Sequence, residues 1–565
     1  MGTETQITTG TQCDHHPSPG LSTLPSRGSA VRVSSPSVSE PGSLAHEAAL
    51  APPIPDMSLP QFVLGQAHTR GDKRALIEPT TGRELTYAQL ADGVREVAAG
   101  LAARGVRAGD VLAICAPNSI DFIVAAYAAS SIGAIVTSTP PVSTHDEIVR
   151  QFLGSAACWL VTTAELFEKK LETAARAARI VETFVIGTMA EPRPKAIPLH
   201  AARVTIDRDP QPSRLPAPSA VAFLPTSSGT TGLPKHVMLT HRNLVANLSQ
   251  LRLVHRPGEQ DVVAMVMPLL HIMGFTLTAL ALLEGATVVI LPQYELDTFL
   301  GAINDHGVTR VEVVPPILLD LANDERVARY DVSSLRLLTS AAAPLAADVA
   351  HACAARLGCR VKQAYGLTEL AGGTHIAPDD GPDRPDSVGP PLPGVECRIL
   401  ELDTGVDVGP GEAGELLLRS ASAMRGYLND QTATDAAIDA DGWVHTGDVV
   451  TVDADGWYRV TDRIKELIKY EGKQVAPAEL EAVLLTHPSV ADVAVVRSPD
   501  PSAGEVPKAF IVLKASASPD ELMDWVAERV SPHKQVRRIK FIGKIPRSPT
   551  GKILRRVLIE REHDA

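Results

Sequence analysis

The sequence predicts an α/β protein with a large N-terminal domain of layered α/β subdomains and a small α+β C-terminal domain. Up to about residue 412, short apolar runs alternate with segments of helical period. Beyond that point, tryptophans, Asp-Gly turns and alternating strands replace this pattern. A length of 565 residues also favours more than one domain.

Composition sets the expected boundaries. Residues 1–55 are rich in Ser, Pro, Gly and Thr, and they contain too few apolar residues to pack, so we expect a disordered leader. The large domain is expected over residues 56–462. The small domain is expected over residues 463–565.

Each expected element has its own signal. The segment LTYAQLADGVREVAAGLAARGV has apolar residues at helical spacing and ends on a glycine, which suits an amphipathic helix and its cap. SIDFIVAAYAASSIGA predicts a second helix, and ELMDWVAERV predicts one in the small domain beside the strand PKAFIVLK. Buried, largely parallel strands are predicted at VLAICAP, IVTSTP, CWLVTT, VVAMVMP, TVVILP, RVEVVPP and LRLLTSAA. Ligands of such sheets bind beyond the carboxyl ends of the strands.

The bulk composition excludes several classes of protein. The net charge of -13 argues against a general nucleic-acid binder, and the basic stretch HKQVRRIK is short and local. No apolar run reaches the roughly 18–20 residues of a membrane span, and the N-terminus lacks the pattern of a secretory signal. Six cysteines without a C-x-x-C pair fit neither a zinc site nor a disulfide framework. We therefore expect a reduced, cytoplasmic protein.

The segment SSGTTGLPK, Ser227 to Lys235, follows the apolar run AVAFLP. Its composition alone favours a surface loop, and it is not the Walker A pattern. It nevertheless has what a phosphate site needs. Gly229 and Gly232 permit tight turns, and hydroxyls, backbone N–H groups and Lys235 can surround an anion.

Four further segments decide between these interpretations: QAYGLTE, GWVHTGD, DRIKELIKYEGKQVAPAELE and PRSPTGKILRR. With SSGTTGLPK, in this order and at this spacing, they resemble the adenylate-forming enzymes, which include acyl-CoA synthetases, 4-coumarate–CoA ligases, luciferases and stand-alone adenylation domains. The resemblance covers roughly residues 56–560 and is nearest to the 4-coumarate–CoA ligase-like branch. It implies an N-terminal adenylation domain and a mobile C-terminal lid.

The resemblance implies a reaction in two halves. A carboxylate attacks the α-phosphate of ATP to give acyl-AMP and pyrophosphate, and a thiol then displaces AMP to give a thioester. The site must neutralise two anions and align them for in-line attack. The implied nucleotide-binding residues are Thr226, Ser227, Ser228, Gly229, Thr230, Thr231, Gly232, Lys235, Ala341, Ala364, Tyr365, Gly366, Thr368, Asp448 and Arg463.

Several of these residues take individual roles by resemblance. The segment from Thr226 to Lys235 would hold the β- and γ-phosphates, and Thr368 would contact the α-phosphate. Glu369 would hold Mg²⁺, which suits one carboxylate plus phosphates because this ion keeps most of its waters. Asp448 and Arg463 would bind the ribose. Tyr365 would stack near adenine.

The catalytic machinery is also implied by resemblance. Lys552 would lie over the substrate carboxylate and the α-phosphate, carried there by the lid. Lys465 would be the hinge about which the lid turns between the two half-reactions. Lys469 and Gln474 match residues with catalytic roles in the 4-coumarate branch, and His271 matches a histidine beside the acyl pocket.

Taken one at a time, these residues have simpler interpretations. Glu369 alone is typical of a solvated acid at a helix start, Lys552 of a solvated lysine, and Tyr365 of a core tyrosine. His271 is open between a pocket residue and a buried structural histidine. The full set of motifs is what favours chemistry.

The chain departs from the family pattern at three places. His236 replaces a usual glycine after the phosphate loop, which matters if that position needs a positive φ. In the expected acyl pocket (His271, Met273, Gly372 and Gly373), Met273 replaces a tyrosine and the two glycines replace bulkier residues such as Pro-Val. These changes predict more space and fewer polar groups, hence an aliphatic medium- or long-chain acid.

The third departure concerns the thiol acceptor. Glu471 and Lys473 stand where the branch commonly has Lys and Phe, beside the expected pantetheine channel. A carboxylate there disfavours the phosphates of CoA, which makes an acyl carrier protein an alternative acceptor. CoA remains the first expectation.

We therefore predict a ligase that uses ATP, Mg²⁺ and CoA, or the phosphopantetheine of a carrier protein, to activate a fatty acid. An aryl, cinnamate-type CoA ligase is an alternative. A nucleotide-binding protein without chemistry is disfavoured because no catalytic position is empty. A luciferase-like oxygenase shares these motifs and would require consumption of O₂.

Overall fold

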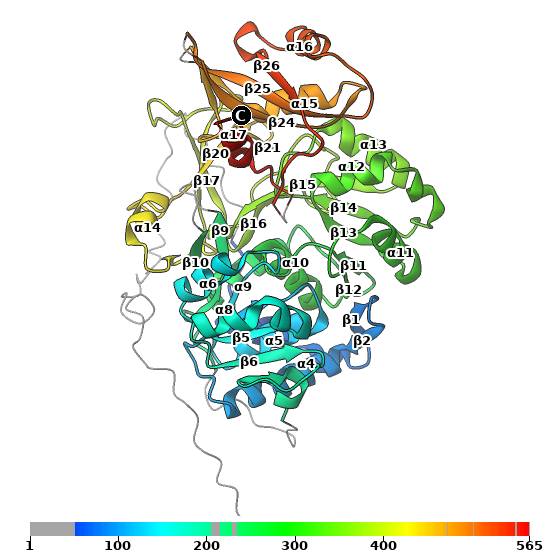
Figure 1. The fold of residues 1–565 in the computed structure, drawn as a ribbon, viewed down its shortest axis with the longest axis vertical. Coiled ribbons are helices and arrows are strands. Elements are labelled where there is room, and N and C mark those ends of the chain that lie inside the picture. Colours follow the sequence, from blue (N-terminus) through cyan, green and yellow to red (C-terminus); the bar gives the residue numbers. More distant parts are fainter. Residues whose placement is uncertain are drawn as a thin grey trace, which may run out of the picture.

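The computed structural model describes residues 51–204, 215–228, 234–471, 473–500, 502–548 and 551–563. Two large sheets, a small antiparallel sheet and a C-terminal domain make up the fold (Figure 1). Nearly all of the expected leader, residues 1–55, lies outside the described residues. Within the described ranges, no helix combines the length and the apolar composition needed to cross a membrane.

The first large sheet is built mainly from the N-terminal part of the chain. Its strands are β3 (Val111–Cys115), β4 (Ile135–Ser138), β5 (Ala157–Thr163), β6 (Glu182–Ile186), β7 (Ala196–Pro198), β8 (Val221–Leu224), β9 (Thr226–Ser228), β10 (Pro234–Thr240) and β19 (Gly426–Tyr427). Strands β8, β4, β3, β5, β6 and β7 are parallel in that order, and β10 and β19 extend the β8 edge antiparallel. The helices of this region are α4 (Tyr87–Ala103), α5 (Ile120–Ser131), α6 (His145–Gly154), α7 (Ala164–Leu166) and α8 (Glu172–Ala177).

The second large sheet joins residues from both ends of the large domain. Its strands are β1 (Arg74–Glu78), β2 (Arg83–Thr86), β11 (Val262–Met265), β12 (Thr287–Ile290), β13 (Arg310–Val313), β14 (Leu337–Ser340), β15 (Arg360–Leu367) and β16 (Gly372–Ile376). The order is β16-β15-β14-β13-β11-β12-β1-β2, parallel except at the two edges. Its helices are α2 (Leu59–Leu64), α3 (Ala67–Arg70), α9 (His241–Leu251), α10 (Ile272–Leu283), α11 (Leu296–His306), α12 (Pro315–Asn323) and α13 (Ala347–Leu357).

A four-stranded antiparallel sheet completes the large domain, with α14 (Gln431–Ala437) beside it. Its strands, in sheet order, are β17 (Glu396–Leu400), β18 (Gly414–Arg419), β20 (Val444–Val452) and β21 (Tyr458–Arg463). This sheet matters for function because β20 and β21 carry the expected ribose-binding pair.

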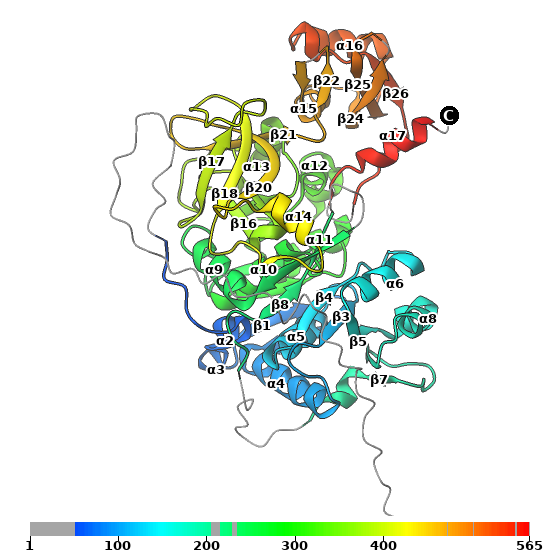
Figure 2. The same ribbon diagram turned by 90° about the vertical axis from the view of Figure 1, so that its left-hand side faces the viewer.

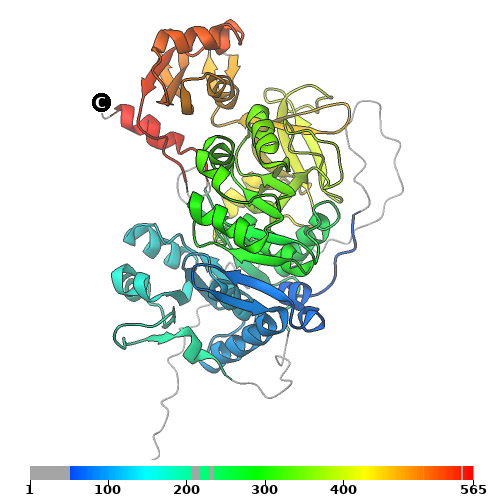
Figure 3. The ribbon, with the colours of Figure 1, turned by 90° about the vertical axis from the view of Figure 1, so that its right-hand side faces the viewer.

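The C-terminal domain is a small α+β unit. It contains β22 (Ile468–Tyr470), β23 (Lys473–Val475), β24 (Val490–Asp500), β25 (Gly504–Leu513), β26 (Arg538–Phe541), α15 (Pro477–Leu485), α16 (Pro519–Ala527) and α17 (Arg555–His563). Figures 2 and 3 show it, in orange and red, above the large domain and away from the first sheet. The predicted division between residues 462 and 463 falls one residue before the end of β21.

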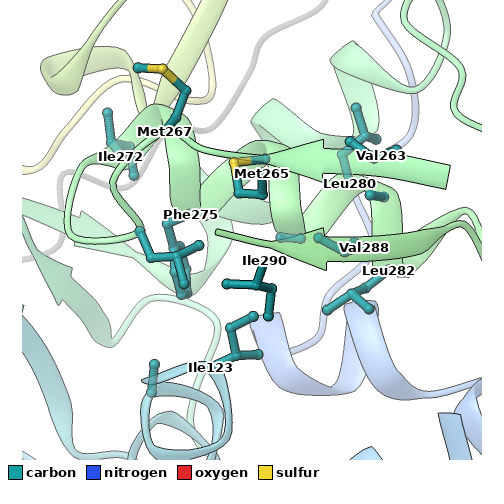
Figure 4. Packing of buried hydrophobic residues seen from close by; sticks show 14 of the residues in the cluster. Ile123, Val263, Met265, Met267, Ile272, Phe275, Leu280, Leu282, Val288 and Ile290 are labelled. Atoms are coloured by element: carbon teal, nitrogen blue, oxygen red, sulfur yellow. The ribbon is translucent and has the colours of Figure 1, made fainter. Parts of the chain in front are cut away.

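Helix α10 packs between the two large sheets. Its Phe275 ring stacks on Tyr127 of α5 at 5.8 Å and on Phe223 of β8 at 4.9 Å between ring centroids. Figure 4 shows Phe275 and Ile123 near the β12 residue Ile290 in the same apolar cluster. The two sheets therefore share one core, which fixes their carboxyl-end loops relative to each other.

The predicted elements of the large domain are present. All seven apolar runs contain the strands expected of them. The predicted amphipathic helix is α4, which begins after a capping box made by Thr86 and Gln89. Gly105 follows the C-cap residue of this helix and has φ 98°, a positive value that glycine adopts more readily than other residues.

Candidate active site

The two ends of the segment SSGTTGLPK lie in two antiparallel strands. In β9 and β10, Lys235 lies opposite Ser227, and His236 lies opposite Thr226. The predicted phosphate ligands Gly229, Thr230, Thr231 and Gly232 lie outside the described residues. The strand pairing brings the hydroxyl-bearing start of the segment and its lysine to the same place.

Tyr427 connects the phosphate segment to the expected metal ligand. It lies on β19, which pairs with β10 so that Tyr427 is opposite Val237. Its hydroxyl donates to Glu369 Oε1 at 2.8 Å, and Lys235 Nζ lies 5.0 Å from the centre of its ring. Burial and the negative charge of Glu369 raise the pKa of Tyr427, so it stays a neutral donor. Sequence reasoning missed this residue because a tyrosine in MRGYLND carries no distinctive signal.

A second cluster joins Tyr365, Asp448 and Arg463. Asp448 and Arg463 face each other in the β20–β21 ladder, with Arg463 Nε 3.0 Å from Asp448 Oδ1. Tyr365 donates its hydroxyl to Asp448 Oδ2 at 2.6 Å. Burial raises the pKa of Tyr365, and the Asp448 charge raises it further. The carboxylate of Asp448 keeps lone pairs that could accept hydrogen bonds from two adjacent hydroxyls of a ligand.

The strand carrying Tyr365 turns sharply after it. A Cβ on Gly366 would lie 2.0 Å from the carbonyl oxygen of Gly372, so only glycine permits this approach of β15 to β16. Thr368 and Glu369 follow in a short 3₁₀ turn, residues Thr368–Leu370. Ala364 lies on β15, and Ala341 follows β14 with its N–H bonded to Val313 O at 3.1 Å. Ala341, Thr368 and Glu369 lie beyond the carboxyl ends of β14 and β15, the ligand-binding edge expected of a parallel sheet. Ala364 lies within β15, just after the last residue paired with β14.

Lys552 reaches this site from the C-terminal domain. It lies on a loop closed by a bridge between Arg547 and Ile553. A Cβ on Gly551 would lie 3.2 Å from the Val314 side chain, which places the loop directly against the large domain. Burial, followed by the charge of Arg463, lowers the pKa of Lys552, whereas Asp448 and Glu369 raise it.

His271 lies on the same side of the site as Lys552. It precedes the first residue of α10. Burial, helped by the charge of Lys552, lowers the pKa of His271 to about 4, so the imidazole is neutral near pH 7. The lid is thus oriented with its lysine in the site, where it can stabilise charge that develops between a carboxylate and a phosphate.

The donor set of the site fits a bound magnesium nucleotide. Within the described residues, no group of three or more His, Cys, Asp or Glu side chains is arranged to hold a metal ion by itself. Glu369 offers a single hard carboxylate, the donor that Mg²⁺ uses together with phosphate oxygens. Lys235 from the phosphate segment and Lys552 from the lid add positive charge to the site, together with Arg463 beside Asp448.

Comparison with known proteins identifies the family. The model of the AMP-binding enzyme family matches residues 64–428, and that of the AMP-binding enzyme C-terminal domain matches residues 479–552. The chain belongs to the AMP-binding enzyme family. It is an AMP-forming acid–thiol ligase by enzyme class.

Individual relatives cover nearly the whole chain. A peroxisomal OPC-8:0-CoA ligase from Arabidopsis thaliana is 38% identical over 522 residues, covering 90% of this chain and 94% of the relative. A 4-coumarate–CoA ligase from Pinus taeda is 38% identical over 501 residues, covering 87% and 92%. The solved structure of the anthranilate CoA ligase AuaEII with anthranoyl-AMP has a TM-score of 0.81 at 27% identity, covering 90% of this chain and 98% of that one.

The expected acyl pocket of this AMP-binding enzyme is narrower than the sequence predicts. A Cβ on Gly373 would lie 3.1 Å from Leu251 Cδ2, and one on Gly372 would lie 3.0 Å from Asn247 Oδ1. The expectation that two glycines open space is therefore wrong, because side chains of α9 fill it. Met273 packs partly buried against the core. Sequence reasoning missed α9 because its contacts with β16 are long-range.

The concern about His236 is also resolved by the structure. His236 lies within β10, and it is not among the described residues with positive φ, so glycine is not required there. Its ring points to α6, where a Cβ on Gly154 would lie 3.2 Å from His236 Cε1. Burial lowers the pKa of His236 to about 4, which makes it a neutral packing residue.

Lys465, Lys469 and Gln474 lie away from Lys552. Lys465 and Lys469 line a hollow with Arg497 and Glu505, and Arg497 donates to the carbonyl oxygen of Lys465 at 3.3 Å. Gln474 is exposed on β23, opposite Lys469. In this lid orientation, the structure brings Lys552 to the nucleotide residues and leaves Lys469 and Gln474 outside.

Proposed function

We propose that this enzyme activates an aliphatic medium- or long-chain carboxylic acid with MgATP and transfers the acyl group to the thiol of CoA. The observation that carries the proposal is the position of Lys552, whose loop lies against Val314 of the large domain and whose charge acts on Glu369, Asp448 and the neutral His271. This arrangement supports attack of a carboxylate oxygen on the α-phosphate, with cleavage of the bond to pyrophosphate.

The chain's own residues would each have a part in the first half-reaction. Lys235 and the hydroxyls of the phosphate segment would hold the departing pyrophosphate, and Asp448 would fix the ribose. Lys552 would neutralise charge that grows on the α-phosphate oxygens. Glu369 would hold a magnesium ion, which supplies further positive charge to the phosphates when it is bound.

The proposal of an aliphatic acid is supported by the lining of the pocket. Thr276 lies between Gly372 and a narrow void, and a Cβ on Gly372 would be 3.5 Å from Thr276 Oγ1. The other residues around this void are Leu59, Leu244, Leu248, Phe275 and Ala279. These side chains, on α2, α9 and α10, are apolar and leave no room for even a water molecule, so an alkyl chain entering past Met273 would have to displace them.

The substrate experiment offers straight-chain acids of increasing length and a set of hydroxycinnamates, each with MgATP and CoA. Burial of one methylene is worth about 0.8 kcal/mol, so kcat/KM should rise roughly fourfold per added methylene for as long as each methylene becomes buried. Pyrophosphate release and the mass of the acyl-CoA give the readouts. Activity confined to hydroxycinnamates would overturn the aliphatic assignment and support an aryl-CoA ligase.

An acyl carrier protein is the second candidate acceptor. Glu471, exposed and held at φ 48°, precedes the exposed Lys473, so a carboxylate stands at the expected thiol entrance. Offering CoA and a holo-carrier protein separately distinguishes the acceptors. Acyl-carrier product without acyl-CoA would show that CoA is rejected, and Glu471→Lys should then restore transfer to CoA.

A further inference from the structure

Asp462 makes a hydrogen bond across the boundary between the large domain and the lid. It lies near the end of β21 and is only 5% exposed. Its Oδ1 accepts from the N–H of Arg463 at 2.7 Å, and its Oδ2 accepts from the N–H of Ala478 at 2.9 Å. Ala478 belongs to the first turn of α15 in the lid.

Helix α15 has no cap of its own. Its N-cap residue, Ala476, has no side chain that can accept a hydrogen bond, and Pro477 at the first helical position has no N–H. The N–H of Ala478 would otherwise lack a partner at the helix start. Asp462 therefore supplies from the large domain the cap that Ser, Thr, Asp or Asn usually supplies locally.

This contact spans the expected hinge. Asp462 precedes Lys465, and its strand is fixed to β20 by the pairing of Asp448 with Arg463. Ala478 follows Lys465 and moves with the lid. A rotation about Lys465 would carry Ala478 away from Asp462, so the cap belongs to this lid orientation.

The same helix is tied to the loop that carries Lys552. Arg555 follows this loop closely and donates to Glu481 Oε1 on α15 at 2.7 Å. It also donates to Val495 O at 3.1 Å and lies 2.9 Å from Glu466. Hydrogen bonds therefore connect Asp462 to α15, and α15 through Arg555 to the loop that carries Lys552.

We propose that Asp462 is a positioning residue that holds the lid in the orientation for acyl-AMP formation and releases it for thioester formation. This inference rests on the proposed function, in which the two half-reactions use different lid orientations. Asp462 contacts no reacting atom in this scheme. It acts by fixing where α15, and hence Lys552, lies.

The test compares the two half-reactions in Asp462→Ala. Loss of a helix cap costs about 0.5–2 kcal/mol, which converts to a roughly 2- to 30-fold fall in the rate of ATP–pyrophosphate exchange. Transfer of the acyl group from supplied acyl-AMP to CoA should be unchanged or faster. The matched control is Ser518→Ala, which removes the cap of α16, another nine-residue helix with proline at its start, entirely within the lid.

The control separates positioning from stability. Ser518→Ala should lower the melting temperature similarly but leave the ratio of the two half-reaction rates at the wild-type value. An Asp462→Ala enzyme with that same unchanged ratio would overturn the positioning role. A wild-type enzyme that makes no acyl-AMP from any acid would instead overturn the proposed function.

Discussion

The contact between α9 and β16 yields a quantitative prediction for the acyl pocket. In Gly373→Val, the new Cβ would lie 3.1 Å from Leu251 Cδ2, and the two methyl groups have to share space with the same side chain. No positive φ is recorded for Gly373, so its backbone can accept valine. We expect overpacking to cost about 1–3 kcal/mol and to lower kcat/KM for aliphatic acids.

Leu251→Ala provides the complementary change. Leu251 is 3% exposed, and removing three buried carbons should cost about 2–5 kcal/mol. The space that is freed is the space that the valine side chain of Gly373→Val would occupy. The double variant should therefore be about 1–3 kcal/mol more stable than the sum of the single effects. Gly372 is not suitable for a matching substitution, because at its φ of 133° any residue with a side chain would be strained.

Urea unfolding and kcat/KM for decanoate measure this cycle. Leu251→Ala alone should also shift the optimum toward longer or wider acids. A double variant whose loss of stability equals the sum of the single losses would refute direct contact between the two positions. An unchanged acid preference in all three variants would show that α9 does not line the pocket.

Three further predictions concern the nucleotide site and the lid. Lys552→Met should slow acyl-AMP formation by about 10²–10³-fold, since it removes one charge aimed at the developing phosphate charge, and ATP–pyrophosphate exchange measures this. Tyr427→Phe removes the hydrogen bond to Glu369 and should lower kcat/KM for MgATP about tenfold. Burial raises the pKa of Glu481 to about 7 and that of Asp462 to about 6, so the folded state binds protons that the unfolded state releases. These two carboxyls therefore contribute stability that is lost as pH rises from about 4 to 7, whereas buried histidines such as His271 and His236 contribute in the opposite direction. Glu481→Gln removes the Glu481 contribution, so the melting temperature of the variant relative to the wild type should increase with pH over that range.

Each of these three predictions can be contradicted by a specific result. Equal losses in exchange and in transfer from supplied acyl-AMP would mean that Lys552→Met disturbs the fold. If Tyr427→Phe weakens CoA as strongly as MgATP, its hydroxyl does not act through Glu369. A difference in melting temperature between the Glu481 variant and the wild type that stays constant from pH 4 to 7 would show that this carboxyl is not a proton acceptor on folding.

The sequence predicted elements and motifs better than it predicted contacts. Strands such as Val111–Cys115 are short apolar runs, and their pattern depends only on local burial. Glu369 and Asp448 could be proposed as site residues because each lies inside a motif. Tyr427 was missed because its role depends on pairing of β19 with a strand almost 200 residues earlier.

The glycines of the acyl pocket show the same limit. The absence of side chains at Gly372 and Gly373 predicts a wider pocket only if no neighbouring side chain occupies the same space. Whether Asn247 and Leu251 fill that space is decided by how α9 packs on β16, and the spacing of residues within either element does not contain that information. Asp462 can likewise be recognised from the sequence only as part of a motif. Its hydrogen bond to Ala478 depends on the orientation of the lid.

The pairing of β10 with β19 also has a consequence for biosynthesis. Lys235 leaves the ribosome about 300 residues before Lys552, which at roughly 5–20 residues per second is a delay of about 15–60 s. By residue 427 every strand of both large sheets has been made, yet Arg463 and the lysine loop have not. A nascent chain can thus complete both large sheets long before it contains Arg463 and Lys552, the residues expected to close the nucleotide site.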